Sequence, residues 1–139
     1  MPVLDSYLFF NGNCADAMRF YEKTLGARVE MMMTYAQSPQ PEHGAAAGAE
    51  NLIMHASLLV GDRRLMASDT PADHPRNAMN GFALSLTYAT PDEARQVFDA
   101  LSVGGKVTMP VAKTFWAEAF GMLVDRFGTP WIVNGGARG

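Results

Sequence analysis

The chain has 139 residues, of which 48% are hydrophobic, enough for one ordinary hydrophobic core. Its 14 acidic and 11 basic residues give a net charge of -3, so no general positive field would attract a nucleic-acid backbone. No apolar run reaches the roughly 20 residues that a membrane helix needs, and the residues from Met1 to Asp5 lack the features of a signal peptide. The single cysteine, Cys14, excludes an internal disulfide. We therefore expect a cytoplasmic protein whose partners include neither nucleic acid nor a membrane.

The start of the chain predicts a strand followed by a helix. Tyr7–Phe10 is short and apolar, which is typical of a strand, and the run Asn11-Gly12-Asn13 breaks it and offers capping oxygens. From Ala15 to Leu25 the large apolar residues recur every three or four positions, which predicts an amphipathic helix. Gly26 then supplies the C-terminal stop.

Three strands complete this first half. They are expected at residues 28–35, 51–60 and 64–68, and Gly61-Asp62 is a hairpin turn signal between the last two. The stretch Gln37–Ala49 contains two prolines, two glycines and four alanines without a sustained period, which indicates a loop.

The second half repeats this order after a loop over residues 69–80. A strand is expected at 82–88, followed by a helix with Thr90 as its cap, Pro91 at its first position and Glu93 three residues after the cap. Gly104-Gly105 ends the helix. The remaining strands are expected at 106–111, 120–124 and 131–133.

The two halves align weakly but in order. Placing Ala17 on Ala94 puts Phe20-Tyr21 opposite Val97-Phe98, and Leu58-Leu59-Val60 resembles Met122-Leu123-Val124. A period near half of the chain predicts two copies of one supersecondary unit. We place them at about 5–70 and about 80–135, packed within a single α+β domain of residues 1–139.

Three segments carry a resemblance to a known family. They are residues 6–10 with Ala17, Phe20, Tyr21 and Gly26; residues 55–69; and Phe115-Trp116 followed by Asp125-Arg126-Phe127-Gly128-Thr129-Pro130-Trp131. The last is the most specific, because its spacing seldom arises from generic strand composition. The chain resembles the PhnB-like branch of the glyoxalase/bleomycin-resistance/dioxygenase superfamily. This resemblance implies paired βαβββ modules that form a curved, U-shaped mixed sheet around a ligand cavity, usually in a homodimer.

The resemblance also implies positions for a divalent metal, which relatives hold with a His or Glu from each of four strands. In this chain the first of these positions falls at Ser6, the last at Ile132, and the strand that opens the second module has Phe82 and its neighbours. Only His55 matches. We therefore expect no metal from the usual ligands and no cofactor, although Glu118 and Asn134 leave a displaced ligand set open.

His55 is the first candidate for a ligand-binding site. It shares a strand face with Ile53, Ser57 and Leu59, so it is either a satisfied core histidine or a ligand anchor or general base. Asp69 ends the next strand and is expected to accept a hydrogen bond from His55 or to cap the following loop.

The other candidates are aromatic, acidic or sulfur-containing. Phe10 and Met66, with Phe9 and Trp131, either stack on an aromatic ligand or fill the core. Trp116 and Glu118 are expected between two strands, either at the mouth of the cavity or on an exposed loop. Cys14 lies near a helix N-terminus, where it is either a thiolate favoured by the dipole or a buried inert thiol.

The motifs of several enzyme classes do not occur. The sequence contains no nucleotide-binding glycine loop, no nucleophile elbow, no His-Glu-x-x-His pattern and no glycine-rich signature for an S-adenosyl donor. Our first hypothesis is a metal-free, small-molecule-binding homodimer with His55 and Glu118 as polar anchors. The alternatives are a glyoxalase- or dioxygenase-type enzyme with a displaced metal ligand set, and a domain that serves only protein–protein interaction.

Overall fold

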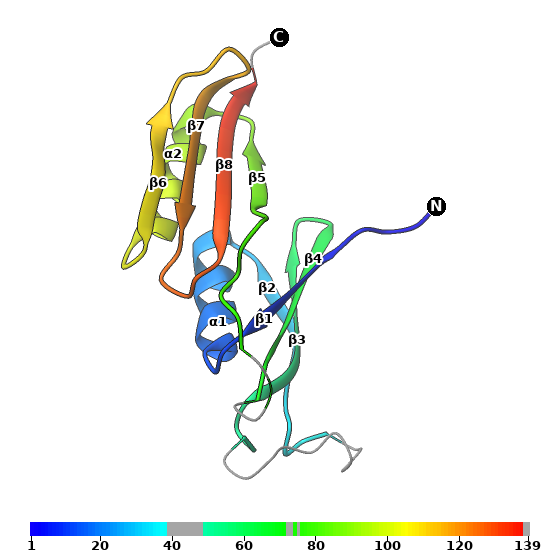
Figure 1. The fold of residues 1–139 in the computed structure, drawn as a ribbon. Helices are drawn as coiled ribbons and strands as arrows, with labels where there is room; N and C mark the ends of the chain where they lie inside the picture. Colours follow the sequence, from blue (N-terminus) through cyan, green and yellow to red (C-terminus); the bar gives the residue numbers. More distant parts are fainter. Residues whose placement is uncertain (39–48, 72–73, 75, 138–139) are drawn as a thin grey trace. The chain divides into compact units, whose positions relative to one another are not determined.

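A computed structural model describes residues 1–38, 49–71, 74 and 76–137. The chain divides into two compact units, residues 1–77 and 78–139, and the division falls in the predicted loop 69–80. Each unit contains a four-stranded mixed sheet and one helix (Figure 1). In the described residues, no helix is long and apolar enough to span a membrane.

The first unit follows the predicted order of strand, helix and three strands. Its elements are β1 (Ser6–Phe10), α1 (Cys14–Leu25), β2 (Arg28–Thr34), β3 (Ile53–Val60) and β4 (Arg63–Asp69). The sheet order is β1-β4-β3-β2, with β1 parallel to β4 and the other pairs antiparallel. Gly26 ends α1 in the left-handed conformation that glycine adopts most readily, as predicted. Most of the predicted loop 37–49 lies outside the described residues.

The second unit repeats this arrangement. Its elements are β5 (Leu84–Tyr88), α2 (Pro91–Ser102), β6 (Lys106–Ala112), β7 (Ala117–Val124) and β8 (Pro130–Ala137). The sheet order β5-β8-β7-β6 has the same topology as the first, which confirms the predicted βαβββ modules.

The predicted alignment of the two halves holds in the helices and fails by one residue in the strands. Ala17 and Ala94 are each the fourth residue of a 12-residue helix, and both are buried. In the strands, Leu58 corresponds to Leu123 rather than to Met122, because these two leucines are the ones that face the helix of their unit. A one-residue shift matters in a strand, since it exchanges the two faces.

In each unit the helix covers one face of the sheet. In the first unit six apolar strand residues on that face are buried and pack with apolar residues of α1; they are Leu8, Phe10, Ala56, Leu58, Leu65 and Ala67. The second unit buries Ala119, Leu123, Trp131 and Val133 with Phe98 and Leu101 of α2 in the same way. Because side chains alternate along a strand, the intervening residues lie on the face opposite the helix.

Two strands of the second unit are longer than predicted. The prediction started β7 at residue 120 and ended β8 at residue 133, whereas Ala117 pairs with Ala137. Glycine is rare in strands, so Gly135 weakened the sequence signal. The structure explains this glycine, because a Cβ atom there would collide with the Thr90 carbonyl oxygen of the α2 cap.

Candidate functional site

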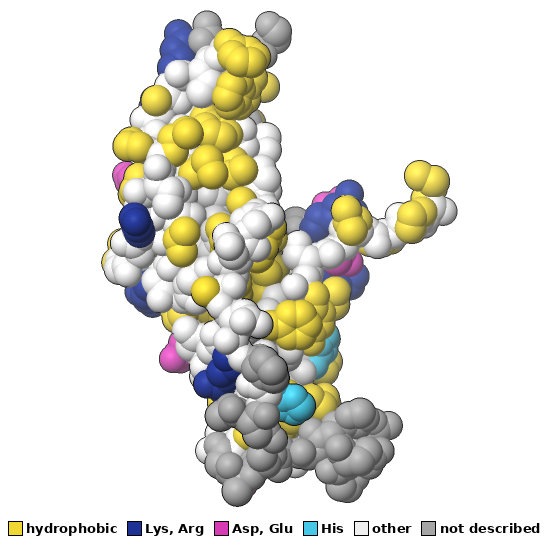
Figure 2. Space-filling model, in the orientation of Figure 1, with side chains coloured by type: hydrophobic (Ala, Val, Ile, Leu, Met, Phe, Trp, Pro, Cys, Tyr) yellow, Lys and Arg dark blue, Asp and Glu magenta, His cyan; other side chains and the backbone are white. Residues whose placement is uncertain are grey.

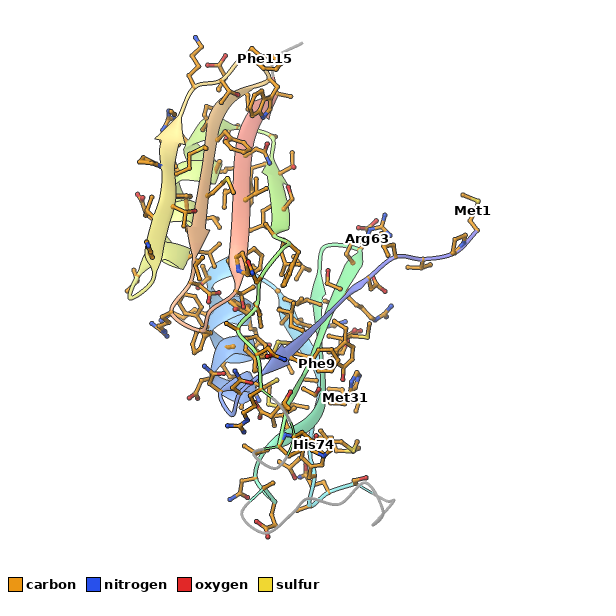
Figure 3. The ribbon with its side chains drawn as sticks, viewed as in Figure 1. Met1, Phe9, Met31, Arg63, His74 and Phe115 are labelled. Atoms are coloured by element: carbon orange, nitrogen blue, oxygen red, sulfur yellow. The ribbon has the colours of Figure 1, made fainter. Side chains whose placement is uncertain are left out.

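We name the sheet surface opposite α1 the first helix-free face. It carries the strand residues that alternate with the buried ones, namely Tyr7, Phe9, Met31, Met33, His55, Ser57 and Met66. Figure 3 shows Phe9 and Met31 on the side of the sheet away from α1. Of the predicted site residues in this unit, His55 and Met66 lie on this face, whereas Phe10 and Asp69 lie on the opposite face beneath α1.

A tyrosine and a histidine meet on the first helix-free face. The hydroxyl oxygen of Tyr7 lies 3.1 Å from Nδ1 of His55, and their rings stack at a centroid distance of 5.6 Å. The pairing arises because β1 lies parallel to β4, which lies antiparallel to β3, so residues 48 positions apart come together. His55 is half-buried, and its partner is Tyr7 rather than the predicted Asp69.

Apolar side chains surround this pair. The ring of Phe9 lies 5.1 Å from that of Tyr7, and Phe9 is 62% exposed. Tyr7 and Met31 are 39% and 38% exposed. Figure 2 shows hydrophobic and histidine side chains side by side on the surface of this unit. Tyr7 was not among the predicted site residues, although its alternation with Leu8 and Phe10 is the sequence signal that places it on this face.

An ion pair occupies one part of the same face. Nε of Arg64 donates to Oε1 of Glu30 at 2.9 Å, and Oγ of Ser57 donates to the same oxygen at 3.4 Å. The hydrogen bond and the negative charge of Glu30 raise the pKa of Arg64 above its ordinary value. A guanidinium nitrogen of Arg28 also lies 4.0 Å from Oε2 of Glu30, so one carboxylate pairs with two guanidinium groups.

Asp69 has a different role from either one predicted. Its carboxylate accepts hydrogen bonds from the backbone N–H groups of Gly12, Cys14 and Ile53 at 2.8 to 3.0 Å, and the residue is 2% exposed. The prediction of a bond to His55 was wrong because the two side chains lie on opposite faces of the sheet. Asp69 therefore caps the start of α1. Within the described residues, the expected cap Asn13 makes no side-chain capping bond.

Of the two alternatives predicted for Cys14, the structure has the buried thiol. It is fully buried, and burial followed by the negative charge of Asp69 raises its pKa from 9.0 to about 12. These two effects outweigh the helix dipole, which favours a thiolate. At neutral pH the side chain is an inert thiol.

The remaining predicted residues, Trp116 and Glu118, belong to the second unit. Glu118 lies on β7 rather than between strands, with its side chain 44% exposed and Oε2 3.9 Å from Nζ of Lys113. Trp116 makes edge-to-face contacts with Phe115 and Phe120 at centroid distances of 4.7 and 5.1 Å. Phe115, labelled in Figure 3, and Trp116 lie between β6 and β7, and Phe120 lies on β7.

The most specific sequence motif, residues 125–131, builds a turn. The carboxylate of Asp125 accepts hydrogen bonds from the backbone N–H groups of Phe127 and Thr129 and from Nε1 of Trp131, at 2.8 to 3.1 Å. Gly128 has a φ of 93°, which few other residues adopt. The motif thus fixes the connection between β7 and β8, and Trp131 is a core residue.

The residues present do not fit the divalent metal of the superfamily. Ser6, where the first metal ligand was expected, lies on the face covered by α1. The neighbouring residue on the helix-free face is Tyr7. Neither Tyr7 nor Ile132 replaces the expected His or Glu. Among the described residues, no group of three or more His, Cys, Asp or Glu side chains is placed to hold a metal ion.

The family follows from comparison with known proteins. The family model described as "Glyoxalase/Bleomycin resistance protein/Dioxygenase superfamily" matches residues 3–133. The chain belongs to this superfamily. Protein YjdN of Escherichia coli strain K12 is 33% identical over 141 residues, with 96% of this chain and 95% of that protein covered.

Two solved structures extend the comparison. Protein PA1353 from Pseudomonas aeruginosa is 41% identical, with a TM-score of 0.89 and coverage of 97% and 98% of the two chains. A Bacillus cereus structure named "Putative 3-demethylubiquinone-9 3-methyltransferase, PhnB protein" is 24% identical, with a TM-score of 0.79 and coverage of 96% and 99%. The predicted superfamily and the predicted glyoxalase/bleomycin-resistance fold are confirmed.

Proposed function

We propose that this superfamily member binds a small molecule without the usual metal, and that the first helix-free face is the binding surface. The observation that carries the proposal is the Tyr7–His55 hydrogen bond, which stands beside the exposed ring of Phe9. Small-molecule sites combine mostly apolar surface with a few polar groups that orient the ligand. This face has that composition.

The chemistry of the face suggests the kind of ligand. Tyr7 and Phe9 supply aromatic surface, and Met31 and Met66 supply flexible thioethers that adapt to irregular apolar shapes. Since Glu30 already pairs with Arg64 and Arg28, an anionic ligand would have to compete with this carboxylate for the two guanidinium groups. We expect an uncharged molecule with an aromatic or apolar part and one hydrogen-bonding group.

The names of relatives add little to this proposal. The methyltransferase name belongs to the Bacillus cereus protein, and this sequence has no glycine-rich signature for an S-adenosyl donor. The poor fit of the four metal positions favours a binding role over the metal-dependent alternative. Glu118 stays a predicted ligand-binding residue of the second unit.

We also propose that the protein is a cytoplasmic homodimer. The single free cysteine suits a reducing compartment. Large hydrophobic side chains are exposed on the second unit, among them Phe115 and Trp116, which supports burial against a second copy.

Elemental analysis with a ligand screen tests the proposed function. Purified protein, incubated with manganese, iron, nickel or zinc, is expected to retain no stoichiometric metal. In a thermal-shift screen of uncharged aromatic compounds, ligands should raise the Tm of the wild type and of the control His74→Ala but not of His55→Ala. A ligand at about 100 times its Kd stabilises by about 2.7 kcal/mol, which such a screen detects.

The opposite result has a clear meaning. One metal per chain that is lost in His55→Ala but kept in His74→Ala would overturn the proposal in favour of a metal-dependent enzyme. Absence of any stabilising compound together with absence of metal would favour a domain that serves only protein–protein interaction.

A further inference from the structure

We propose that Tyr7 and His55 form a proton relay that interconverts the enol and keto forms of an uncharged aromatic carbonyl compound. The inference rests on the binding function proposed above, because the compound must first lie on the first helix-free face. It adds a reaction and a substrate class to that site.

The hydrogen bond between the two side chains allows two arrangements of protons. Oη of Tyr7 and Nδ1 of His55 are 3.1 Å apart, and a neutral imidazole carries its proton on one ring nitrogen only. With the proton on Nδ1, the imidazole donates to Tyr7, so the phenol donates outward and Nε2 accepts. With the proton on Nε2, the phenol donates to Nδ1, and the outward roles are exchanged. The pair therefore offers one donor and one acceptor in either arrangement.

Both groups are available to a ligand. Tyr7 is 39% exposed and His55 is half-buried, and within the described part of the chain neither side chain makes another hydrogen bond. Their stacked rings keep the donor and the acceptor on the same side of the sheet. Two groups held together in this way can reach the same small ligand, which general acid–base catalysis requires.

The protons balance in the reaction. The enol O–H bond breaks and its proton moves to Nε2 of His55, while the Nδ1 proton moves to the Tyr7 oxygen. The Tyr7 O–H bond breaks, and its proton forms a C–H bond with the electron pair of the enol double bond as the carbonyl group forms. No oxidant, reductant or cofactor is consumed. The pair ends in its other proton arrangement, which catalyses the reverse reaction or returns by exchange with water.

The surroundings select the substrate class. The ring of Phe9, 62% exposed and 5.1 Å from that of Tyr7, provides a surface on which an aryl group can stack next to the relay. Glu30 pairs with Arg64 at 2.9 Å and with Arg28 at 4.0 Å, so a carboxylate on the substrate would compete with Glu30 for these two guanidinium groups. Uncharged aryl ketones and 1,3-diketones fit both features.

Benzoylacetone, an uncharged aromatic 1,3-diketone, is the probe for the test. Its enol absorbs in the ultraviolet, so ketonisation after dilution into water is followed directly, and deuterium uptake at carbon is followed by NMR in heavy water. Wild-type protein should accelerate both processes. Tyr7→Phe, which keeps the ring but removes the hydroxyl, and His55→Gln should each lower the protein-catalysed rate by about 10²-fold. The matched controls Tyr88→Phe and His74→Gln should keep it.

Binding is measured on the same proteins by chemical-shift changes, and folding by circular dichroism. Benzoylacetone that binds wild type and Tyr7→Phe equally but reacts no faster than in buffer would overturn the relay and leave the binding function standing. Equal catalysis by wild type and Tyr7→Phe would also overturn the relay. If the probe neither binds nor reacts, the relay is overturned for this class, and the binding function is decided by the ligand screen.

Discussion

The carboxylate of Asp69 and the thiol of Cys14 share one buried environment at the start of α1. The backbone N–H of Cys14 donates to Oδ1 of Asp69 at 3.0 Å, and the same carboxylate raises the pKa of the thiol. Both residues are chemically reactive types, yet their contacts here are structural. Tyr7 is of a residue type common in strands, and it is the residue whose side chain contacts His55.

At the residue scale, we predict that Cys14 lowers stability at high pH. Its pKa is about 12 in the folded protein and close to 9.0 when the chain unfolds, so the unfolded state loses its proton first. The stabilisation that comes from keeping this thiol protonated is therefore complete below pH 9 and is lost as the pH rises toward about 12. The free energy of unfolding of wild type, measured in urea from pH 7 to 11, should fall more steeply than that of Cys14→Ala. Parallel pH profiles would contradict the assignment.

At the element scale, the two helices begin in different ways. In α2 the cap is local: the N–H of Glu93 donates to Oγ1 of Thr90, whose hydroxyl donates to Oε1 of Glu93, and Pro91 follows the cap. In α1 the cap comes from β4, where Asp69 accepts bonds from residues 55 and 57 positions earlier. The sequence pattern predicted the first arrangement, but for the second it placed the capping oxygens in the run Asn11-Gly12-Asn13 rather than at Asp69.

This difference predicts three unequal losses of stability. Thr90→Ala should cost about 1 kcal/mol, as is usual for the loss of a cap. Asp69→Asn should cost about 1.5 to 3 kcal/mol, because it removes a charge from buried hydrogen bonds and turns an amide donor toward an N–H group. Asn13→Ala should change stability by a few tenths of a kcal/mol, since its side chain does not cap. Urea unfolding measures all three, and a larger loss for Asn13→Ala than for Asp69→Asn would contradict this account of α1.

At the scale of the whole molecule, two units with the same topology each leave one sheet face without a helix. In Figure 1 the second sheet lies in front of α2, and Figure 2 shows hydrophobic side chains gathered on this face. Phe82, Met109, Phe115 and Trp116 of this unit are all at least 42% exposed. Contiguous exposed apolar surface is typical of interaction sites.

We predict from this surface that the protein is a homodimer in solution. Sedimentation equilibrium should give twice the chain mass of 15.1 kDa at micromolar concentration. Trp116→Glu should weaken the association, because it places a charge within the aromatic cluster, whereas Arg95→Glu on the exposed side of α2 should not. A monomer at all concentrations tested would contradict the prediction.

Local patterns in the sequence determined most of the secondary structure, the repeat and the family. Apolar spacing predicted both helices, and glycine and proline predicted the turns. Three segments carried the resemblance to the superfamily, and part of the most specific one, residues 125–131, builds the turn between β7 and β8. These features depend on residues close together in the chain, so sequence reasoning reaches them.

Only the tertiary structure decided which residues meet. Tyr7 and His55 are 48 positions apart, and Asp69 and Gly12 are 57 apart, so strand pairing and register bring them together. Residues one position apart in a strand lie on opposite faces of the sheet. For this reason Ser6 and Asp69 lie beneath α1, whereas Tyr7 and His55 lie on the first helix-free face. The sequence alone therefore named His55 as a site residue, but its partner depends on the parallel pairing of β1 with β4.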